Sequence, residues 1–347
     1  MRPRLLLLVH LPPPLHGVTV VNETIVASQL LRDTFDVRVI PLQFADGLDD
    51  IGRASSRKLL VAAHIAARLV RELATWRPEA LYVSISPRGA AFVRDAAYVA
   101  LARALRVPVI LHWHGVLPAQ RGRLLDATLR TTSSIFLSER LAGNARVRAR
   151  AIVPNGIADV ARGEQGAAGR RILFLSNLQR SKGPLVLLDA LAKLRARGVP
   201  FTATFAGGAG NDDTAAAVEQ AAREVPGIAY AGPVVGAAKA RLFANHDLFV
   251  HPTLDDAFPL VLLEAMQHGL PVVSTNVGGI PDIVAEGETG FVVSPGDADA
   301  LAARIEQLLG DPARCTRMSA AARRHYEDHY TLDRFERTLV AALAELA

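Results

Sequence analysis

The sequence is poor in cysteine and in aromatic residues, and it has no long apolar run. A single cysteine, Cys315, excludes a disulfide framework and offers no metal-ligand spacing, which favours a reducing compartment. With 5% aromatic residues, the chain lacks the stacking platforms that binding to single-stranded nucleic acid requires. No stretch approaches the roughly 18–20 apolar residues of a membrane span. The apolar start, Leu5–Val9, is shorter than the roughly 7–15-residue core of a signal peptide, so we expect a cytoplasmic protein.

Charge is plentiful but unevenly distributed. Residues 1–155 hold 21 Lys and Arg against 11 Asp and Glu, a net charge of +10, whereas residues 156–347 hold 18 against 23, a net charge of −5. A basic half points to an anionic partner: a membrane surface and nucleic acid are both candidates on charge alone, beside an ordinary solvated surface. Residues 56–76 are predicted to form the longest helix and the main basic face. Its basic residues are Arg57, Lys58, Arg68 and Arg71, and its expected buried side is Leu59, Leu60, Ile65, Leu69, Val70 and Leu73.

Apolar runs of strand length alternate with helical segments along the chain. This alternation predicts an α/β fold with parallel sheets covered by helices on both faces. The turn Pro154-Asn155-Gly156 and the polar stretch after it separate two such sets, so we predict a boundary between residues 157 and 158. Two doubly wound domains placed face to face leave a cleft between the carboxyl ends of their strands, where ligands bind in such folds. Strands are expected at 4–9, 37–40, 80–85, 108–112, 134–137 and 151–153, then at 172–175, 202–206, 228–230, 248–251 and 272–274.

The densest group of signals runs from Asp256 to Pro281, DAFPLVLLEAMQHGLPVVSTNVGGIP. Pro259 suits the first turn of a helix, because its φ is fixed and it has no N–H. Asp256 then precedes the helix and Glu264 lies within it, so that both carboxylates reach one ligand. Free N–H groups from Phe258 to Leu260 point into the same space as an anion site. An ordinary buried helix with an acidic residue at its start is the alternative.

Three other strand-to-helix junctions carry small or polar residues. Gly17 precedes a helix after the first strand, where an anion can approach the backbone N–H groups closely. His114 follows the fourth strand, where we expect it to hydrogen-bond a substrate or to take up a proton. The alternative is an ordinary core histidine. Asn177, Arg180 and Lys182 lie between a strand and the next helix. Cations there oppose the helix dipole unless an anion lies between them, so the junction fits a diphosphate, with an exposed basic loop as the alternative.

The remaining motifs give no support for a cofactor or a metal. Residues 205–210, FAGGAG, lack the G-x-G-x-x-G spacing of a dinucleotide fingerprint. Asp297-Ala298-Asp299 looks like a D-x-D metal motif, but it precedes an amphipathic helix, so helix capping explains it better. No G-x-S-x-G motif, Walker sequence or Cys/His cluster is present. We therefore expect neither a cofactor nor a metal ion.

In this order, these pieces resemble the family-4 glycosyltransferases of GT-B architecture over nearly the whole chain. Residues 256–281 are similar to the family block E-G-F-P-x-x-x-x-E-A-M-x-x-G-x-P-V-V-x-[ST]-x-x-G-G-x-P, and FLSNLQRSKG, residues 174–183, looks like its diphosphate-binding segment. The resemblance implies two Rossmann-like doubly wound domains facing across a cleft. Residues 1–157 would bind the acceptor and residues 158–330 the nucleotide sugar, and a C-terminal helix, 331–347, would pack back on the first domain.

The resemblance also implies a retaining transfer of a sugar from a nucleotide-diphosphate sugar to a hydroxyl acceptor. Glu264 would hold the ribose hydroxyls, and Lys182 with the backbone near Phe258, Pro259 and Leu260 the diphosphate. Asp256 would touch the donor sugar, Gly17 would pack under the phosphates, and His114 would lie near the reacting centre.

This sequence departs from the family pattern in the donor site itself. Asp256 stands for a glutamate, Ala257 for a glycine, and Ser176-Asn177 for Gly-Arg. Arg180 is the candidate to replace the missing cation, and we include Asn177 with it in the donor site.

Two alternatives remain on the same fold: a catalytically inactive nucleotide-sugar-binding protein and an epimerase. A phosphorylase would need a cofactor lysine site, which is not seen. The expected acceptor is a glycan or a lipid-linked glycan in surface polysaccharide or glycolipid biosynthesis. The basic first domain would then contact an anionic membrane at its cytoplasmic face, without a nucleic-acid partner.

Overall fold

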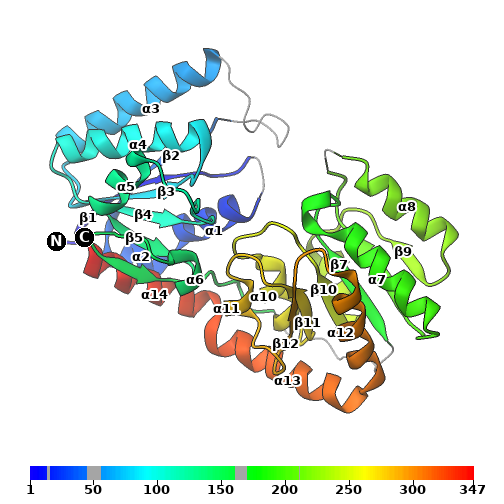
Figure 1. Cartoon of the computed structure of the whole chain (residues 1–347). Helices are drawn as coiled ribbons and strands as arrows, with labels where there is room; N and C mark the ends of the chain where they lie inside the picture. Colours follow the sequence, from blue (N-terminus) through cyan, green and yellow to red (C-terminus); the bar gives the residue numbers. More distant parts are fainter. Residues whose placement is uncertain (14–15, 45–55, 161–169, 211) are drawn as a thin grey trace. The chain divides into compact units, whose positions relative to one another are not determined.

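The computed structural model describes residues 1–13, 16–44, 56–160, 170–210 and 212–347. The chain divides into two compact units: unit 1 comprises Met1–Asn155 and Asp333–Ala347, and unit 2 comprises Gly156–Leu332. Each unit is a sheet with helices packed on it (Figure 1). The boundaries predicted from the sequence lie after residues 157 and 330.

Unit 1 is built on a six-stranded parallel sheet in the order β2-β1-β3-β4-β5-β6. Its inner strands are mostly apolar and buried along nearly their whole length, as expected of a sheet covered by helices on both faces. The strands are β1 (Arg4–Val9), β2 (Asp36–Pro41), β3 (Ala80–Ile85), β4 (Val109–Trp113), β5 (Ser133–Phe136) and β6 (Arg150–Ile152). The helices are α1 (Gly17–Ala27), α2 (Gln29–Thr34), α3 (Ser56–Thr75), α4 (Gly89–Ala104), α5 (Arg123–Arg130) and α6 (Glu139–Ala142), joined by most of α14 (Leu332–Leu346).

Unit 2 repeats the plan with a parallel sheet in the order β12-β11-β10-β7-β8-β9. Its first strand, β7, lies inside the sheet, so the chain winds outward from it in both directions. The strands are β7 (Arg171–Leu175), β8 (Thr202–Ala206), β9 (Ile228–Tyr230), β10 (Leu248–His251), β11 (Val272–Thr275) and β12 (Gly290–Val293). The helices are the 3₁₀ turn η2 (Arg180–Lys182), α7 (Pro184–Ala196), α8 (Thr214–Glu224), α9 (Gly236–Ala244), α10 (Leu260–Gln267), α11 (Ile280–Ile283), α12 (Ala298–Gly310) and α13 (Pro312–His329). The prediction of two doubly wound parallel sheets is confirmed.

The last helix returns to the first unit, as predicted. Helix α13 lies in unit 2, whereas α14 belongs to unit 1 from Asp333 onward. There the Ser133 hydroxyl of β5 donates a hydrogen bond to the carbonyl of Leu346 over 3.4 Å. The chain enters unit 2 near Ile157 and leaves it near Thr331, and these two residues form a parallel β-bridge.

Two expectations about helices have clear outcomes. The D-x-D segment is a helix cap, as predicted, since the Asp297 carboxylate accepts a hydrogen bond from the N–H of Ala300 over 2.8 Å. The predicted buried side of α3 is partly wrong. Ile65, Leu69 and Leu73 are buried in the core of unit 1, but Leu59, Leu60 and Val70 are exposed. The helix carries apolar residues on more than one side, and only the side at 65, 69 and 73 faces the core.

Candidate functional site

Asp256 and Glu264 occupy the positions that the sequence predicted for them in unit 2. Asp256 lies in the loop between β10 and α10, and Glu264 lies in the second turn of α10. Helix α10 begins at Leu260, with Pro259 as the residue that caps it. The N–H groups of Leu260 and Val261 therefore precede the first intrahelical bond, which runs from Leu262 to the carbonyl of Pro259.

Asp256 is held between one cation and one buried histidine. The ammonium of Lys182 lies 2.6 Å from the Asp256 Oδ2 atom and also donates to the carbonyl of Asp255 over 3.3 Å. His251, at the end of β10, places Nε2 at 3.7 Å from the same Oδ2, and its ring contacts those of Phe174 and Phe249, with centroid distances of 6.1 and 6.3 Å. Burial raises the pKa of the Asp256 carboxyl, but His251 and the charge of Lys182 outweigh it, so the pKa is lowered overall. Asp256 is therefore ionised and paired at neutral pH.

Two glycines allow this loop to lie against its neighbours. Gly183, which links η2 to α7, has φ +76°, and a Cβ there would lie 1.9 Å from the carbonyl oxygen of Pro252. Gly278 has φ +53°, and a Cβ there would lie 2.1 Å from the carbonyl oxygen of Asp256. Only glycine accepts both the left-handed backbone and the close approach. The glycine pair after β11 and the glycine after Lys182 thus fix the position of the Asp256 backbone.

Hydrogen bonds join the same loop to the turn that carries Lys182. The Thr253 hydroxyl and the N–H of Leu254 both donate to the carbonyl of Ser181, over 3.0 and 2.7 Å. The N–H of Gly279 donates to the carbonyl of Ala257 over 2.7 Å. The β7–α7, β10–α10 and β11–α11 junctions therefore form one connected structure at the carboxyl edge of the unit 2 sheet.

Glu264 has a partner that the sequence did not reveal. Lys239, from α9, lies 2.6 Å from the Glu264 Oε1 atom, and both side chains are about three-quarters buried. Lys239 is the one charged residue before Arg241 in an otherwise small and apolar helix, GAAKARLFA. That pattern does not distinguish a site lysine from a surface lysine, so no sequence signal could have found it.

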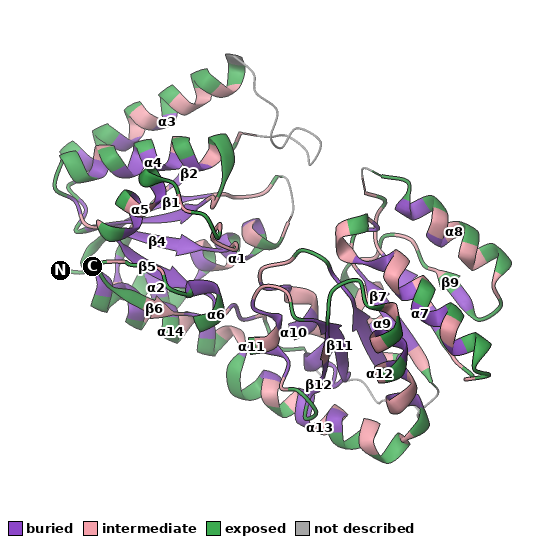
Figure 2. Ribbon diagram, in the orientation of Figure 1, coloured by how far each residue is buried: buried purple, intermediate pink, exposed green. Residues whose placement is uncertain are grey.

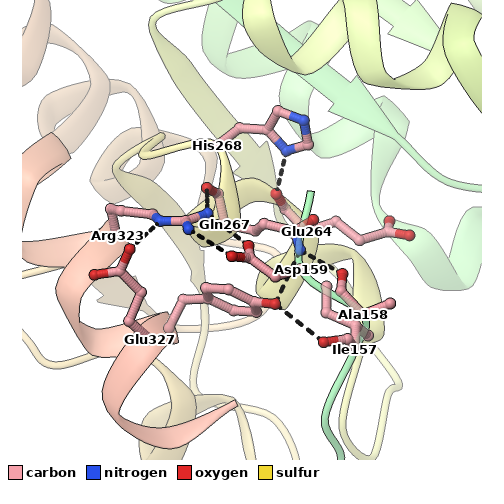
Figure 3. Close-up of polar contacts among 9 residues, drawn as sticks. Ile157, Ala158, Asp159, Glu264, Gln267, His268, Arg323 and Glu327 are labelled. Carbon is pink, nitrogen blue, oxygen red and sulfur yellow. Dashed lines mark hydrogen bonds and ion pairs between the residues drawn. The ribbon is translucent and has the colours of Figure 1, made fainter. Parts of the chain in front are cut away.

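Helix α10 is anchored one turn beyond Glu264, as Figure 3 shows. Gln267 donates to the carbonyl of Ala158 over 2.6 Å and to the Tyr326 hydroxyl over 2.9 Å. Tyr326 in turn donates to the carbonyl of Ile157 over 3.0 Å, and Arg323 donates to the carbonyl of Gln267 over 2.7 Å. Helix α13 and the segment at 157–158 thereby hold the end of α10, and with it the orientation of Glu264.

Arg180 and Asn177 lie in the β7–α7 junction with Lys182, but they make different contacts. The N–H of Arg180 donates to Asp212 over 2.9 Å, and its exposed guanidinium lies 4.0 Å from the Asp213 carboxylate. Asn177 is fixed through its backbone, whose carbonyl accepts from Gln179 over 2.9 Å. The structure thus joins Lys182 to Asp256 directly and leaves the side chain of Arg180 at the acidic residues that precede α8.

The two predicted residues of unit 1 lie at the carboxyl edge of its own sheet. Gly17 is the first residue of α1, and a Cβ there would meet nothing within 4 Å. His114 follows β4; it is buried, its ring lies 4.0 Å from that of His112, and neither of its nitrogens has a hydrogen-bond partner among the described residues. The pKa of His114 is lowered to about 3, mainly by burial and further by the nearby His10 and His16. The side chain is therefore a neutral imidazole at pH 7, which suits hydrogen bonding better than the uptake of a proton.

Residues near His114 that the sequence did not single out complete this edge. His10 follows β1, and burial together with the nearby Arg94 lowers its pKa to about 4. Arg94 holds the buried Asp95 at 2.7 Å, and Asp95 also accepts from the N–H of Ser86 over 2.9 Å. Because both oxygens of Asp95 are engaged, this carboxylate is a structural anchor for the end of β3.

The described ranges hold neither a cluster of metal-ligating side chains nor a helix that could span a membrane. No three His, Cys, Asp or Glu side chains there lie close enough together to hold a metal ion. None of the helices in those ranges is both long enough and apolar enough to cross a membrane.

Comparison with known proteins matches the second half of the chain to one family model. Residues 169–311 match the family described as glycosyl transferases group 1. The sulfoquinovosyl transferase SQD2 of Arabidopsis thaliana is 26% identical over 306 residues, covering 79% of this chain and 58% of that protein. The GDP-mannose-dependent alpha-(1-6)-phosphatidylinositol monomannoside mannosyltransferase of Mycolicibacterium smegmatis is 36% identical over 189 residues, covering 50% of this chain and 47% of that protein. The chain thus spans about half the length of these curated relatives.

Solved structures match the chain along its whole length. HepE of Anabaena, in complex with UDP, has a TM-score of 0.77 at 20% identity and covers 99% of this chain and 100% of its own. Sucrose-phosphate synthase from Thermosynechococcus elongatus has a TM-score of 0.72 at 19% identity, with 99% of each chain covered. The likeness confirms the predicted GT-B fold.

Proposed function

We propose that this chain, whose residues 169–311 form a domain of the glycosyl transferases group 1 family, transfers a sugar from a nucleotide-diphosphate sugar to a hydroxyl acceptor. The relatives named above are a sulfoquinovosyl transferase and a GDP-mannose-dependent mannosyltransferase, and the HepE structures contain UDP or UDP-glucose. The observation that carries the proposal is the pairing of Lys182 with Asp256 beside the start of α10. A cation and free helix N–H groups at one sheet edge are what a diphosphate requires.

The two lysine–carboxylate pairs give the donor site a defined resting state. The diphosphate of the donor would replace the Asp256 carboxylate at Lys182, with the N–H groups around Phe258 and Leu260 sharing its charge. Asp256, released from Lys182, would turn to the hydroxyls of the donor sugar. Glu264, oriented by Lys239 and by the anchor at Gln267, would accept hydrogen bonds from the ribose hydroxyls. Pro259 contributes the fixed start of α10, and Asn177, Arg180 and Gly17 would border the phosphates.

We propose a same-face retaining reaction that needs no metal ion or other cofactor. Lys182 and the start of α10 would stabilise the departing diphosphate electrostatically. The acceptor hydroxyl would attack the anomeric carbon from the side on which the nucleotide leaves, while the bond from that carbon to the diphosphate oxygen breaks and the hydroxyl proton passes to the departing diphosphate. Asp95, a buried carboxylate of unit 1, is engaged by Arg94 and Ser86, which argues against its acting as the nucleophile of a double displacement. His114, a neutral imidazole with unpaired nitrogens, would hydrogen-bond a sugar hydroxyl near the reacting centre.

We further propose an acceptor at the cytoplasmic face of an anionic membrane, a glycan or lipid-linked glycan of surface polysaccharide or glycolipid biosynthesis. The net charge of +10 over residues 1–155 supports an anionic partner for this half of the chain. Binding of the protein to phosphatidylglycerol vesicles at low salt, measured by co-sedimentation, tests this part of the proposal. Absence of binding would remove the membrane contact and leave the transferase assignment untouched.

The activity is tested by incubating the protein with UDP-, GDP- and ADP-sugars and measuring release of the nucleoside diphosphate. We expect release with one base, and a loss of about a hundredfold or more in turnover for Glu264→Gln with an unchanged circular dichroism spectrum. Glu219→Gln, at a partly exposed glutamate of α8, is the matched control and should retain full turnover. Donor binding without release would instead indicate an inactive nucleotide-sugar-binding protein. Conversion of the sugar while it stays on the nucleotide would indicate an epimerase.

A further inference from the structure

Helix α3 presents a second apolar stripe to solvent, opposite the side that it buries. Leu59 and Leu60 are 74% and 72% exposed, and Val70 is 38% exposed. Ala63, Ala67 and Ala74 are also exposed and continue the stripe at helical spacing. Figure 2 shows in green how much of α3 is exposed. From Leu59 to Val70 the stripe extends about 16 Å along the helix at 1.5 Å per residue. Single exposed leucines are common on protein surfaces, but a contiguous stripe on a helix that is already anchored by another side indicates a contact surface.

Basic residues border the stripe on one side. Arg57, His64 and Arg71 are exposed there. Glu72 is the only acidic residue of the sequence between 57 and 75, and it is mostly buried, 2.8 Å from Arg38 and 3.7 Å from Arg71. Arg38 itself lies over the ring of Trp76, with 4.6 Å from its guanidinium carbon to the ring centroid. Along the described residues of α3, the border of the apolar stripe is therefore positively charged and carries little opposing charge.

We propose that α3 lies flat on an anionic lipid bilayer, with Leu59 and Leu60 inserted at the boundary between headgroups and acyl chains. An exposed helix with one apolar side, a basic border and a low content of acidic residues is the pattern of helices that bind in the membrane interface. The arginines contact anionic headgroups, and the leucines add a component that salt does not screen. The inference rests on the proposed membrane contact and assigns it to one face of one helix.

Membrane binding through this face of α3 is tested by co-sedimentation with phosphatidylcholine vesicles, with and without phosphatidylglycerol, at low and at high salt. We expect the unsubstituted protein to bind the anionic vesicles and to retain part of its binding at high salt. Leu59→Glu combined with Leu60→Glu should lower the partition coefficient about tenfold or more. Leu105→Glu combined with Leu124→Glu, at two leucines of unit 1 that are 44% and 49% exposed, makes the same change in net charge. This control should lower binding by about threefold or less.

A second pair, Leu59→Lys with Leu60→Lys, separates insertion from charge. It raises the positive charge, so it should strengthen binding if attraction alone holds the protein and weaken it if the leucines insert. Stronger binding of this pair, or equal losses for the two glutamate pairs, would overturn the assignment to α3. If the unsubstituted protein does not bind at low salt, the proposed membrane contact falls with it. Donor hydrolysis in solution, which does not depend on α3, should stay the same in every variant and reports on the transferase proposal separately.

Discussion

Asp256 is one methylene shorter than the glutamate of the family motif, and the structure shows what the shorter side chain reaches. Its Oδ2 atom is shared between the Lys182 ammonium at 2.6 Å and His251 Nε2 at 3.7 Å. His251 is 1% exposed, and neither of its ring nitrogens has a partner at hydrogen-bonding distance in the part of the chain that the structure describes. If the donor diphosphate takes Lys182, as we propose, His251 remains beside Asp256.

This arrangement predicts that His251 positions Asp256 when the donor is bound. His251→Phe keeps an aromatic ring in contact with Phe174 and Phe249 but removes the nitrogens. It should lower kcat for the donor about tenfold and change the free energy of unfolding by about 1 kcal/mol or less. In an Asp256→Asn background the same substitution should have little further effect, because the residue it positions has lost its charge. Independent, additive losses from the two substitutions would contradict this role.

The neutral histidines of unit 1 predict a loss of stability in mild acid. Burial lowers the pKa of His10 to about 4 and that of His114 to about 3, below the ordinary value of 6.5. The unfolded chain therefore binds more protons than the folded chain below pH 6.5, so stability decreases as the pH falls towards 4. The effect amounts to at most about 3 kcal/mol for each histidine at pH 4. Urea unfolding of His114→Gln should show a shallower loss between pH 6.5 and 4, whereas His64→Gln, at an exposed histidine, should follow the unsubstituted protein.

At the scale of elements, three loops are held together by close backbone contacts that only glycine permits. Gly183→Ala should therefore destabilise the protein by at least about 2 kcal/mol more than Gly296→Ala. Both glycines have nearly the same φ, +76° and +79°, but a Cβ at Gly296 meets nothing within 4 Å, whereas at Gly183 it meets the carbonyl of Pro252. The difference between the two variants in chemical unfolding thus isolates the contact from the backbone strain. Equal losses would show that the loops are not closely packed at this point.

The sequence predicted most strands closely because each is a short apolar run bounded by turn residues. It missed β12, which begins at Gly290 and is four residues long, and it misjudged α3. Alanine and leucine occur all around α3, so periodicity alone does not tell which apolar side faces the core. Tertiary packing determines which side is buried, because strand β2 and helix α4 pack against α3 and the side at 65, 69 and 73 lies in the core.

The candidate site, like the fold, could be predicted from the sequence only in part. The positions of Asp256, Glu264 and Lys182 follow from a local motif, and the structure has each on the predicted loop or helix. The pairing of Lys182 with Asp256 and of Lys239 with Glu264 does not follow from that motif, since Lys182 and Asp256 are 74 positions apart and Lys239 belongs to no motif. Such contacts depend on the winding of the sheet and on glycine contacts between loops, which a reading of local patterns does not contain.

For the whole molecule, the charge separation along the sequence coincides with the division of labour that we propose. The basic first half carries the α3 face and the histidines near His114. The second half carries the two lysine–carboxylate pairs and matches the family model. The central claim is that Lys182, at the edge of the unit 2 sheet, binds the diphosphate of a nucleotide sugar.

Calorimetric titration tests that claim most directly. Kd is measured for UDP, GDP and ADP, and for the matching nucleosides, with the unsubstituted protein and with Lys182→Gln. We predict that one nucleoside diphosphate binds and that Lys182→Gln weakens it about ten- to a hundredfold, while the weaker binding of the nucleoside changes little. If no nucleoside diphosphate binds, or if Lys182→Gln leaves its Kd unchanged, the account is contradicted.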